Sequence, residues 1–588
     1  MTRYDILIKG GLIADGLGGE PIEADVAVAD GRIAAVGKIS GSGIEEVDAR
    51  GLLVTPGFVD IHTHLDGYVT WSTQLDPLPK HGITTAMFGN CGVGFAPCRS
   101  EDRGRLVTLM EGVEDIPEPV LTEGLPWNWT SFPDYLDAIE SRQYDIDICA
   151  QLPHAPLRVF VMGQRAANHE PATADDIAQM GGLTKDAMLA GAFGFSTSRS
   201  LAHRGSDGAN TPSLDATEAE LTAIGEGMKA AGRGVIQLIS DFDDIDAEFG
   251  IFRRVAEKSG RPMSMSVVQQ PYAPDRWRQI LDRIAEANRD GLVMRAQVCG
   301  RPVGMLAGFE ITFCPFSFCP TYQQISQLPF QEKLAALRRP DLRARIIEEF
   351  AVPFEQRGGV IAGLRAAIDM RSIARKLTDL NNIFPLGDPI NYEPSPEMSV
   401  AQLAEKEDRS AADYVYDLLL GHDGRALLYI PVTNYVDHTL DVAKAMLTDK
   451  NTVLGLSDAG AHSSFVCDVS FTTFMLTNWA RDRKPGLPLG FVVQSLTSRT
   501  AQTVGLMDRG VLATGYRADI NIIDLAKLRL HTPKVIYDLP GGGKRLTQET
   551  EGYVLSIVKG VPTYRDGKHT GALPGRLVRA GRQQAVGP

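Results

Sequence analysis

Two histidines at the end of an apolar run are the clearest candidates for chemistry in this chain. His62 and His64 stand in VTPGFVDIHTHLD (54–66), where the apolar run predicts a strand. Residues two apart on a strand point to the same face, so both imidazoles would supply half of a transition-metal site. Two solvated surface histidines would give the same pattern, so further candidate ligands along the chain must decide between the two interpretations.

A thiol and a carboxylate are the next candidate ligands. Cys91 lies in GNCG, and Asp458 lies in GLSDAGAH (455–462). Together with two imidazoles they form a donor set that suits zinc. A carboxylate beside a metal-activated water can also take its proton and pass it to a leaving nitrogen, so Asp458 is the candidate catalytic acid and base. The alternatives are a small buried cysteine for Cys91 and a helix N-cap for Asp458.

The elements that must position these residues follow an α/β pattern. Helical segments such as 172–191 and 216–232 alternate with short apolar runs, and eight strands are what a (β/α)8 barrel requires. The predicted strands are 54–62, 83–90, 146–152, 191–197, 234–240, 263–269, 293–299 and 452–458. Function in such a barrel gathers at the carboxyl ends of the strands, where the candidate ligands stand.

One interval breaks the repeat. About 150 residues separate the seventh predicted strand from the eighth, which is too long for a simple crossover. Helical patterns at 330–350 and 398–421 indicate an inserted helical segment. It is either a lid over the barrel mouth or an appendage that serves stability or assembly.

The sequence pattern at both ends of the chain predicts short β-strands, with Asp-Gly turns at Asp30-Gly31 and Asp566-Gly567. This indicates one small β domain built from both termini. The predicted domains are 1–55 for its first part, 56–505 for the barrel with the insertion at about 305–430, and 506–588 for its second part and the tail.

Bulk composition narrows the class of protein. The 588 residues predict two or more domains, and the net charge of -14 argues against nucleic acid or an anionic membrane as a partner. Seven cysteines without a compact framework favour reduced thiols. The N-terminal MTRYDILIKGG has no apolar signal core, so we expect a cytoplasmic protein without a membrane span. Homo-oligomerisation stays open.

The chain resembles the amidohydrolase superfamily, and within it the D-aminoacylase, or N-acyl-D-amino-acid deacylase, branch. The matching strings are GFVDIHTHLD (57–66), VTW (69–71), HGITTAMFGNCGVGFAP (81–97), GAFGFSTS (191–198), LSDAGAH (456–462) and ADINIIDL (518–525). The resemblance implies a distorted (β/α)8 TIM barrel with a small urease-type β-sandwich domain from both termini. It also implies that His62 and His64 match the metal ligands of the first strand, Cys91 the bridging cysteine and Asp458 the catalytic aspartate.

The chain departs from this family at its fifth and sixth strands. The family carries two further metal histidines there, whereas 234–244 and 263–272 contain none. Amides are poor zinc ligands compared with imidazole, so we predict one divalent metal ion, zinc, held by His62, His64 and Asp458, with Cys91 as a further ligand.

Other polar residues at strand ends are candidates for binding substrate. Arginines offer a bidentate clamp for a carboxylate, although they often only cover a surface. His203 is either a hydrogen-bonded loop histidine or a substrate contact. The candidate substrate-binding residues are Arg199, His203, Gln237, Gln297 and Arg301.

These observations predict a metal-dependent hydrolase that cleaves a non-peptide C–N bond in a small molecule, as an N-acyl-D-amino-acid deacylase does. A cyclic amide or ester hydrolase would use the same machinery. The alternative from another class is a catalytically degenerate barrel that acts as a binding or assembly scaffold, which the loss of two metal histidines would favour.

Overall fold

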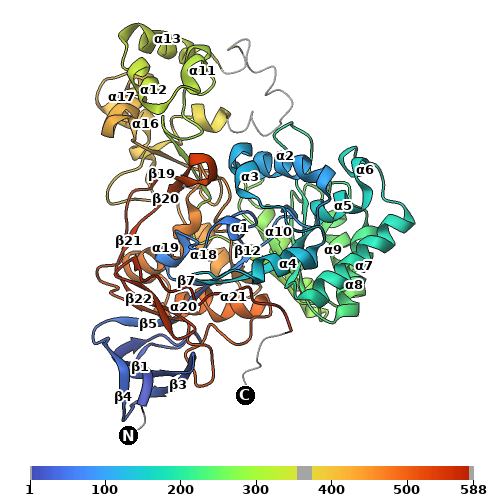
Figure 1. Ribbon diagram of the computed structural model, residues 1–588. Coiled ribbons are helices and arrows are strands. Elements are labelled where there is room, and N and C mark those ends of the chain that lie inside the picture. Colours follow the sequence, from blue (N-terminus) through green and yellow to red (C-terminus); the bar gives the residue numbers. More distant parts are fainter. Residues whose placement is uncertain (1–2, 354–355, 357–373, 582–588) are drawn as a thin grey trace.

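A curled parallel sheet of eight strands forms the centre of the computed structural model, which describes residues 3–353, 356 and 374–581 (Figure 1). In spatial order the strands are β16 (Thr452–Leu454), β12 (Met294–Val298), β11 (Met263–Ser266), β10 (Val235–Ser240), β9 (Gly194–Arg199), β8 (Asp147–Pro153), β7 (Ile83–Phe88) and β6 (Phe58–Asp60). The carboxyl ends of the first and last strands meet, because Thr63 bridges Ala459. The predicted distorted barrel is confirmed, and each predicted run overlaps one of its strands.

Helices with clear start and stop signals surround this sheet. Thr173 caps α7 and Thr217 caps α8, and both helices end at a glycine in the left-handed conformation, Gly191 and Gly232. The helices that follow the strands are α4 (Phe132–Glu140), α5 (His154–Met162), α7 (Ala174–Ala190), α8 (Glu218–Ala231), α9 (Ile245–Ser259), α10 (Arg276–Arg289), α18 (Asp441–Thr448), α20 (Leu489–Leu496) and α21 (Ser498–Thr503). Further helices lie in the connections: α1 (Tyr68–Trp71), α2 (Arg103–Glu114), α3 (Glu118–Gly124), α6 (Gln164–Ala167) and α19 (Phe471–Phe474).

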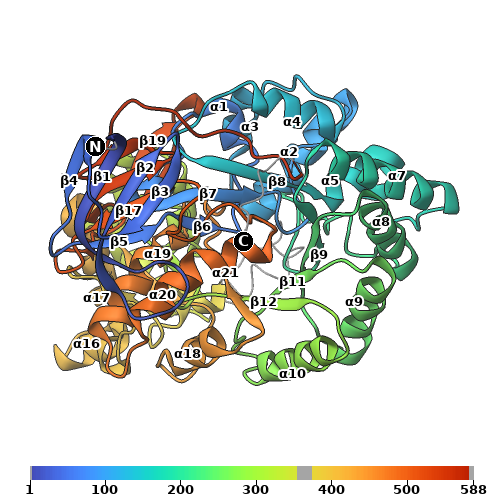
Figure 2. The ribbon, with the colours of Figure 1, turned by 90° about the horizontal axis from the view of Figure 1, so that it is seen from below.

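A second sheet joins the two ends of the chain (Figure 2). Its strands are β1 (Arg3–Ile13), β2 (Ile22–Ala29), β3 (Arg32–Gly37), β4 (Ser42–Asp48), β5 (Leu53–Pro56), β17 (Ile520–Ile523), β22 (Tyr553–Val558), β23 (Val561–Arg565) and β24 (Lys568–His569). The antiparallel pairing of β5 with β17 links the N-terminal and C-terminal parts. A separate β-rich domain built from both termini is therefore confirmed.

The predicted strand 54–62 is divided between the two sheets. β5 belongs to the β domain, and β6 opens the barrel. Gly57 lies between them, where a Cβ atom would stand 2.1 Å from Thr84 Oγ1. Only glycine allows this close approach, so the short junction holds the first barrel strand rigidly against the β domain.

The inserted segment is a subdomain with a core of its own, at the top of Figure 1. It contains the small sheet β13 (Gly304–Ala307), β15 (Leu428–Pro431) and β14 (Phe384–Pro385), and the helices α11 (Pro320–Ser326), α12 (Phe330–Leu337), α13 (Pro340–Ala351), α16 (Val400–Lys406) and α17 (Ala411–Gly424). Pro340 divides the predicted helix 330–350 in two. Part of the predicted insertion, 357–373, lies outside the described residues.

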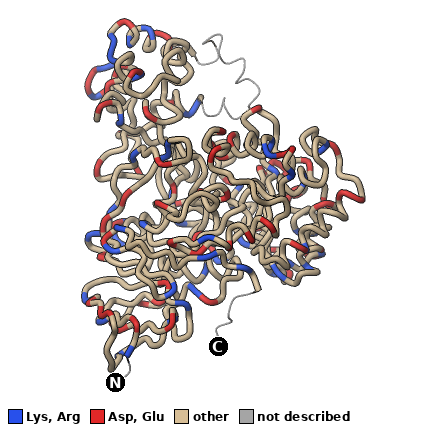
Figure 3. The backbone as a smooth tube through the Cα atoms, viewed as in Figure 1, with Lys and Arg blue, Asp and Glu red and all other residues tan. Residues whose placement is uncertain are grey.

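Two hairpins leave the C-terminal half of the β domain. They pair β18 (Arg529–Leu530) with β21 (Thr550–Glu551) and β19 (Lys534–Leu539) with β20 (Gly543–Thr547). The second hairpin reaches the barrel mouth, where Leu546 N donates to Ser463 O at 2.7 Å. Acidic and basic residues are interspersed over all parts of the molecule (Figure 3). No helix among the described residues is long and apolar enough to cross a membrane.

Candidate metal centre and active site

The backbone that follows β6 places the two histidines at the barrel mouth. Thr63 N donates to Met87 O at 3.0 Å, and His64 N donates to Ala459 O at 2.8 Å. This extended segment is therefore held on both sides, between the ends of β7 and β16. Its alternation directs His62 and His64 to one face, with rings 5.5 Å apart and exposed fractions of only 1% and 2%.

Cys91 reaches the same face from the turn after β7. It adopts a left-handed conformation with φ 55°, and its N–H donates to Gln237 Oε1 at 2.9 Å. Its Sγ lies 3.3 Å from His62 Nε2. The ligand atoms of His62, His64 and Cys91 all lie within 4.8 Å of one another, and they form the one histidine, cysteine and carboxylate group of this kind among the described residues.

Asp458 completes the cluster from the last strand. Its Oδ1 lies 3.4 Å from His62 Nε2 and 3.9 Å from His64 Nε2. Its side chain is 20% exposed, in contrast to both imidazoles. It borders a small cavity of about 40 Å³, which is also lined by Asp468 and Arg545. Asp458 is thus the member of the cluster that a substrate can reach.

The spacing of these four donors fits a metal ion. A tetrahedral zinc ion with bonds of about 2.0–2.3 Å holds neighbouring ligand atoms roughly 3.3–3.8 Å apart. The sulfur-to-nitrogen distance of 3.3 Å and the first oxygen-to-nitrogen distance of 3.4 Å fall within this range, and the second oxygen-to-nitrogen distance, 3.9 Å, lies just above it. The structure brings together all four predicted ligands, and their role in metal binding stays a prediction.

The protonation of the cluster also suits a cation. Burial lowers the pKa of His62 to about 4 and that of His64 well below its usual value, so both imidazoles are neutral and can donate a lone pair. Burial raises the pKa of Asp458 to about 8 and that of the Cys91 thiol well above its usual value. A divalent cation would supply the positive charge that stabilises both anions.

Buried polar groups orient the two imidazoles from behind. Glu114, at the end of α2, places Oε1 3.0 Å from His64 Nδ1, and both side chains are 2% exposed. Gln297 on β12 places Oε1 2.6 Å from His62 Nδ1 and donates from Nε2 to Ser264 Oγ on β11. The Gln297 acceptor on His62 Nδ1 fixes the tautomer that leaves His62 Nε2 free for a metal, whereas Glu114 approaches His64 Nδ1 at an ion-pair distance without hydrogen-bond geometry.

The strands that lack the family's histidines therefore carry supporting groups. Gln237 on β10 accepts from the Cys91 backbone, and Ser264 on β11 accepts from Gln297. Gln237 thereby positions the Cys91 backbone, and Ser264 positions Gln297, which in turn contacts His62. Gln237 and Gln297, predicted to bind substrate, are each 1% exposed; Gln297 uses both ends of its amide in these contacts, whereas Gln237 Nε2 is buried without a hydrogen-bond partner.

Two further histidines approach the cluster. His203, in the loop after β9, accepts from or donates to Ser198 Oγ through Nδ1 at 2.8 Å. His462 follows Asp458 and donates its backbone N–H to Glu114 O. Burial lowers the pKa of each to about 4, and the imidazoles of His462 and His62 contribute to the shift at His203. His203 is therefore one of the predicted substrate contacts that lie near the candidate ligands.

The two arginines predicted to clamp an anion are engaged elsewhere. Arg199 Nη2 lies 2.7 Å from Glu248 Oε1, and Arg199 Nε donates to Glu248 Oε2. Arg301 is buried, pairs with Asp468 at 2.8 Å and stacks 4.0 Å from the centre of the Tyr392 ring. Neither guanidinium is directed at the four candidate ligands, because each is held by an acidic partner from another element.

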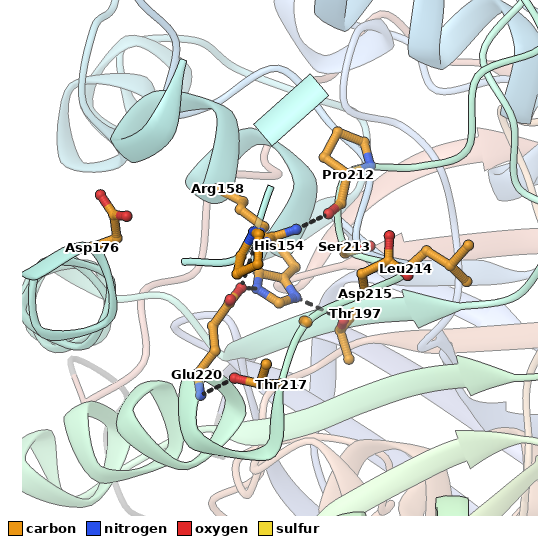
Figure 4. A network of polar contacts seen from close by, with 12 residues as sticks. His154, Arg158, Asp176, Thr197, Pro212, Ser213, Leu214, Asp215, Thr217 and Glu220 are labelled. Atoms are coloured by element: carbon orange, nitrogen blue, oxygen red, sulfur yellow. Dashed lines mark hydrogen bonds and ion pairs between the residues drawn. The ribbon is translucent and has the colours of Figure 1, made fainter. Parts of the chain in front are cut away.

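A buried polar network supports the loop that carries His203 (Figure 4). His154 Nε2 lies 2.9 Å from Glu220 Oε1, and its Nδ1 lies 2.8 Å from Thr197 Oγ1. Arg158 Nε lies 3.2 Å from the same Glu220 oxygen, and Arg158 Nη1 donates to Pro212 O in the loop. Glu220 is thus paired with two basic side chains, His154 and Arg158. The hydrogen bond from Arg158 to Pro212 O anchors the loop 200–217.

Two residues of the site carry no signal in the sequence. Glu114 is one of many acidic residues in a helix, and only the packing of α2 brings it behind His64. Arg545 lies on β20, in the segment that sequence analysis assigns to the β domain, yet it lines the cavity beside Asp458. It pairs there with Asp538 at 2.7 Å.

Solved structures share this fold over the whole chain. A D-aminoacylase structure aligns with a TM-score of 0.62 and 22% identity, covering 98% of this chain and 100% of that one. An N-acyl-D-glutamate deacylase from Bordetella bronchiseptica, solved with zinc and a phosphonate inhibitor, gives a TM-score of 0.61 and 21% identity with the same coverage. The likeness shows the fold.

Sequence comparison points to the same group of proteins. An uncharacterized protein of Mycobacterium tuberculosis is 26% identical over 636 residues, covering 100% of this chain and 96% of that protein. A D-aminoacylase of Alcaligenes xylosoxydans xylosoxydans is 36% identical over 197 residues, covering 33% of this chain and 37% of the enzyme. The model of the amidohydrolase family matches residues 45–564, so the chain belongs to the amidohydrolase family and is a hydrolase of carbon–nitrogen bonds other than peptide bonds.

Proposed function

We propose that this chain is an N-acyl-D-amino-acid deacylase-like hydrolase that uses a single zinc ion. The observation that carries the proposal is the convergence of His62, His64, Cys91 and Asp458 at the barrel mouth, with no third strand histidine behind them. The aligned D-aminoacylase structure is described as having a binuclear metal centre with one-metal activation and second-metal attenuation. That description supports one working ion in this chain too.

The mechanism assigns the proton transfers to Asp458. A bound zinc ion would acidify a water molecule and polarise the amide carbonyl. Asp458 takes the proton of the attacking water and returns it to the nitrogen of the leaving amine, so the C–N bond breaks without a charged leaving group. His62 and His64 stay neutral throughout, because burial holds the pKa of both imidazoles below its usual value.

The names of the curated relatives support the substrate class. D-aminoacylase, N-acyl-D-aspartate deacylase and N-acyl-D-glutamate deacylase of Alcaligenes xylosoxydans xylosoxydans are 36%, 36% and 31% identical over parts of the chain. Each name describes cleavage of an amide next to a D-configured carbon. His203 is the side chain that we assign to substrate contact, since it lies close to the donor cluster.

The same proposal includes the cell compartment and the partners. All seven cysteines are buried and none of them forms a disulfide within the described residues, which supports a location in the reducing cytoplasm. The proposed partner is a small-molecule substrate.

A substrate panel tests the proposal. Zinc-loaded protein should release amine from N-acetyl-D-amino acids faster than from their L-enantiomers, with cyclic amides and simple esters as competing substrates. Preference for a cyclic amide or an ester would replace the substrate class while keeping the hydrolytic site. If none of these substrates is cleaved while zinc is bound, the chain is a catalytically degenerate barrel and the proposal fails.

A further inference from the structure

A second cavity, of about 510 Å³, lies at the opposite end of the barrel from Asp458. It is lined by the first residues of three barrel strands, Val235, Met263 and Thr452, and by the end of α21. Figure 2 looks at the molecule from this side, with β9, β11, β12 and α21 around the region. Its volume lies within the roughly 300–1,000 Å³ typical of sites for small molecules.

Five basic side chains line this cavity, and no acidic residue does. They are Arg233, Arg261, Arg295, Lys450 and Arg499. They come from five different places along the chain and converge only in the fold. Within the described part of the chain none of them forms an ion pair, whereas Arg199, Arg301 and many other arginines do. In a protein with a net charge of -14, this local excess of positive charge is unusual.

The protein itself uses few of the hydrogen-bond donors in this cluster. Arg499 donates to Thr452 O at 2.7 Å, Arg233 to Ala580 O at 2.7 Å and Arg295 to Met294 O at 3.0 Å. Arg261 Nε is buried without a partner. Each guanidinium carries five N–H donors, so most donors remain available to a ligand.

The guanidinium groups are also close enough to repel one another. Burial and the neighbouring Arg295 lower the pKa of Arg499, and the charge of Asp449 opposes this shift. Holding like charges together costs free energy, which a bound anion would recover.

We propose that this cavity binds a small phosphorylated molecule through a diphosphate group. Planar guanidinium forks match phosphate oxygens in pairs, and several forks around one cavity suit adjacent phosphates better than a single carboxylate. Phe193, Val235 and Val504 line the same cavity and offer an apolar surface to the organic part of such a molecule. The site is distant from the hydrolytic centre and is independent of the substrate proposed for it.

Binding of inorganic pyrophosphate and of ADP to the full-length protein tests the proposal. Isothermal titration calorimetry should show saturable binding of both, accompanied by a rise in Tm, since a ligand that binds only the folded state stabilises it. Arg261→Gln and Arg295→Gln should each weaken the affinity at least tenfold, because each removes a charged fork. Lys450→Gln, at an exposed position, should weaken it by about threefold and covers the case in which an arginine variant does not fold.

Arg254→Gln is the matched control. Arg254 is exposed on α9 and pairs with Glu218, so its loss removes one positive charge away from the cavity and should leave the affinity unchanged. Binding of pyrophosphate alone would show that the cavity recognises the phosphate groups. Tighter binding of ADP would show that it also recognises the organic part of the molecule. The proposal is overturned if neither ligand binds saturably at millimolar concentration, if citrate binds as tightly as pyrophosphate, or if the cavity variants bind as the control does.

Discussion

The two ends of the barrel gather ionisable groups of opposite type, acids at one end and bases at the other. At the carboxyl end, the partly exposed Asp458 lies with the buried Glu114 and Cys91, and the only ion-pair partners described for the two carboxyl groups are histidines. At the amino end, the arginine cavity has no acidic lining residue. A third buried cluster, His154 with Glu220 and Arg158, matches its charges internally. The comparison indicates that matched clusters serve the fold, whereas each end without a counter-charge is a candidate ligand site.

Replacing the exposed acid of the carboxyl end should have the largest effect. Asp458→Asn keeps the shape of the side chain but removes the proton acceptor, so kcat should fall about 10³-fold. Initial rates on the best substrate of the panel measure this, with metal content determined in parallel. A loss of less than tenfold with metal retained would assign the proton transfer to another group.

Breaking the matched cluster should damage stability rather than metal binding. Glu220→Gln leaves the buried Arg158 without its counter-charge and should lower the free energy of unfolding by about 3 kcal/mol. Urea unfolding monitored by circular dichroism measures this change. Zinc affinity should be unchanged in the same variant. A parallel loss of zinc affinity would show that this cluster also supports the metal centre.

Removing support behind a ligand should weaken the metal site moderately. Gln297→Ala frees His62 Nδ1 and should reduce zinc affinity about 10- to 100-fold, as losses of such supporting contacts do. Competition with a chromogenic chelator measures the affinity. Gln74→Ala, at an exposed position, is the matched control, and equal affinities in the two variants would show that Gln297 plays no part.

The smallest expected effect lies at the amino end of the barrel. Without an added anion, Arg295→Gln should raise the free energy of unfolding by about 0.5 kcal/mol, because it relieves repulsion from Arg499. With pyrophosphate present, the wild type should become the more stable of the two. A variant that is less stable than the wild type in both conditions would give Arg295 a structural role instead.

Local sequence patterns were sufficient to predict the barrel strands and the four candidate ligands. Apolar runs mark each strand, and His62, His64, Cys91 and Asp458 stand directly after such runs, where a barrel gathers them. The likeness of this segment to known hydrolases added the expected roles.

Long-range partners could not be predicted in the same way. Arg199 is paired with Glu248, 49 residues away, and Arg301 with Asp468, 167 residues away, so neither pairing has a local signal. The arginine cavity draws on five separate segments for the same reason. Which charged side chains remain unmatched depends on the packing of the whole chain, and that imbalance is what identifies both candidate ligand sites.

The metal content of the purified protein tests the central claim most directly. Inductively coupled plasma mass spectrometry on protein prepared without chelator should find about one divalent ion per chain in the wild type and in Gln74→Ala, and almost none in His62→Ala. Two tightly held ions in the wild type, or an unchanged metal content in His62→Ala, would contradict a single ion held by His62, His64, Cys91 and Asp458.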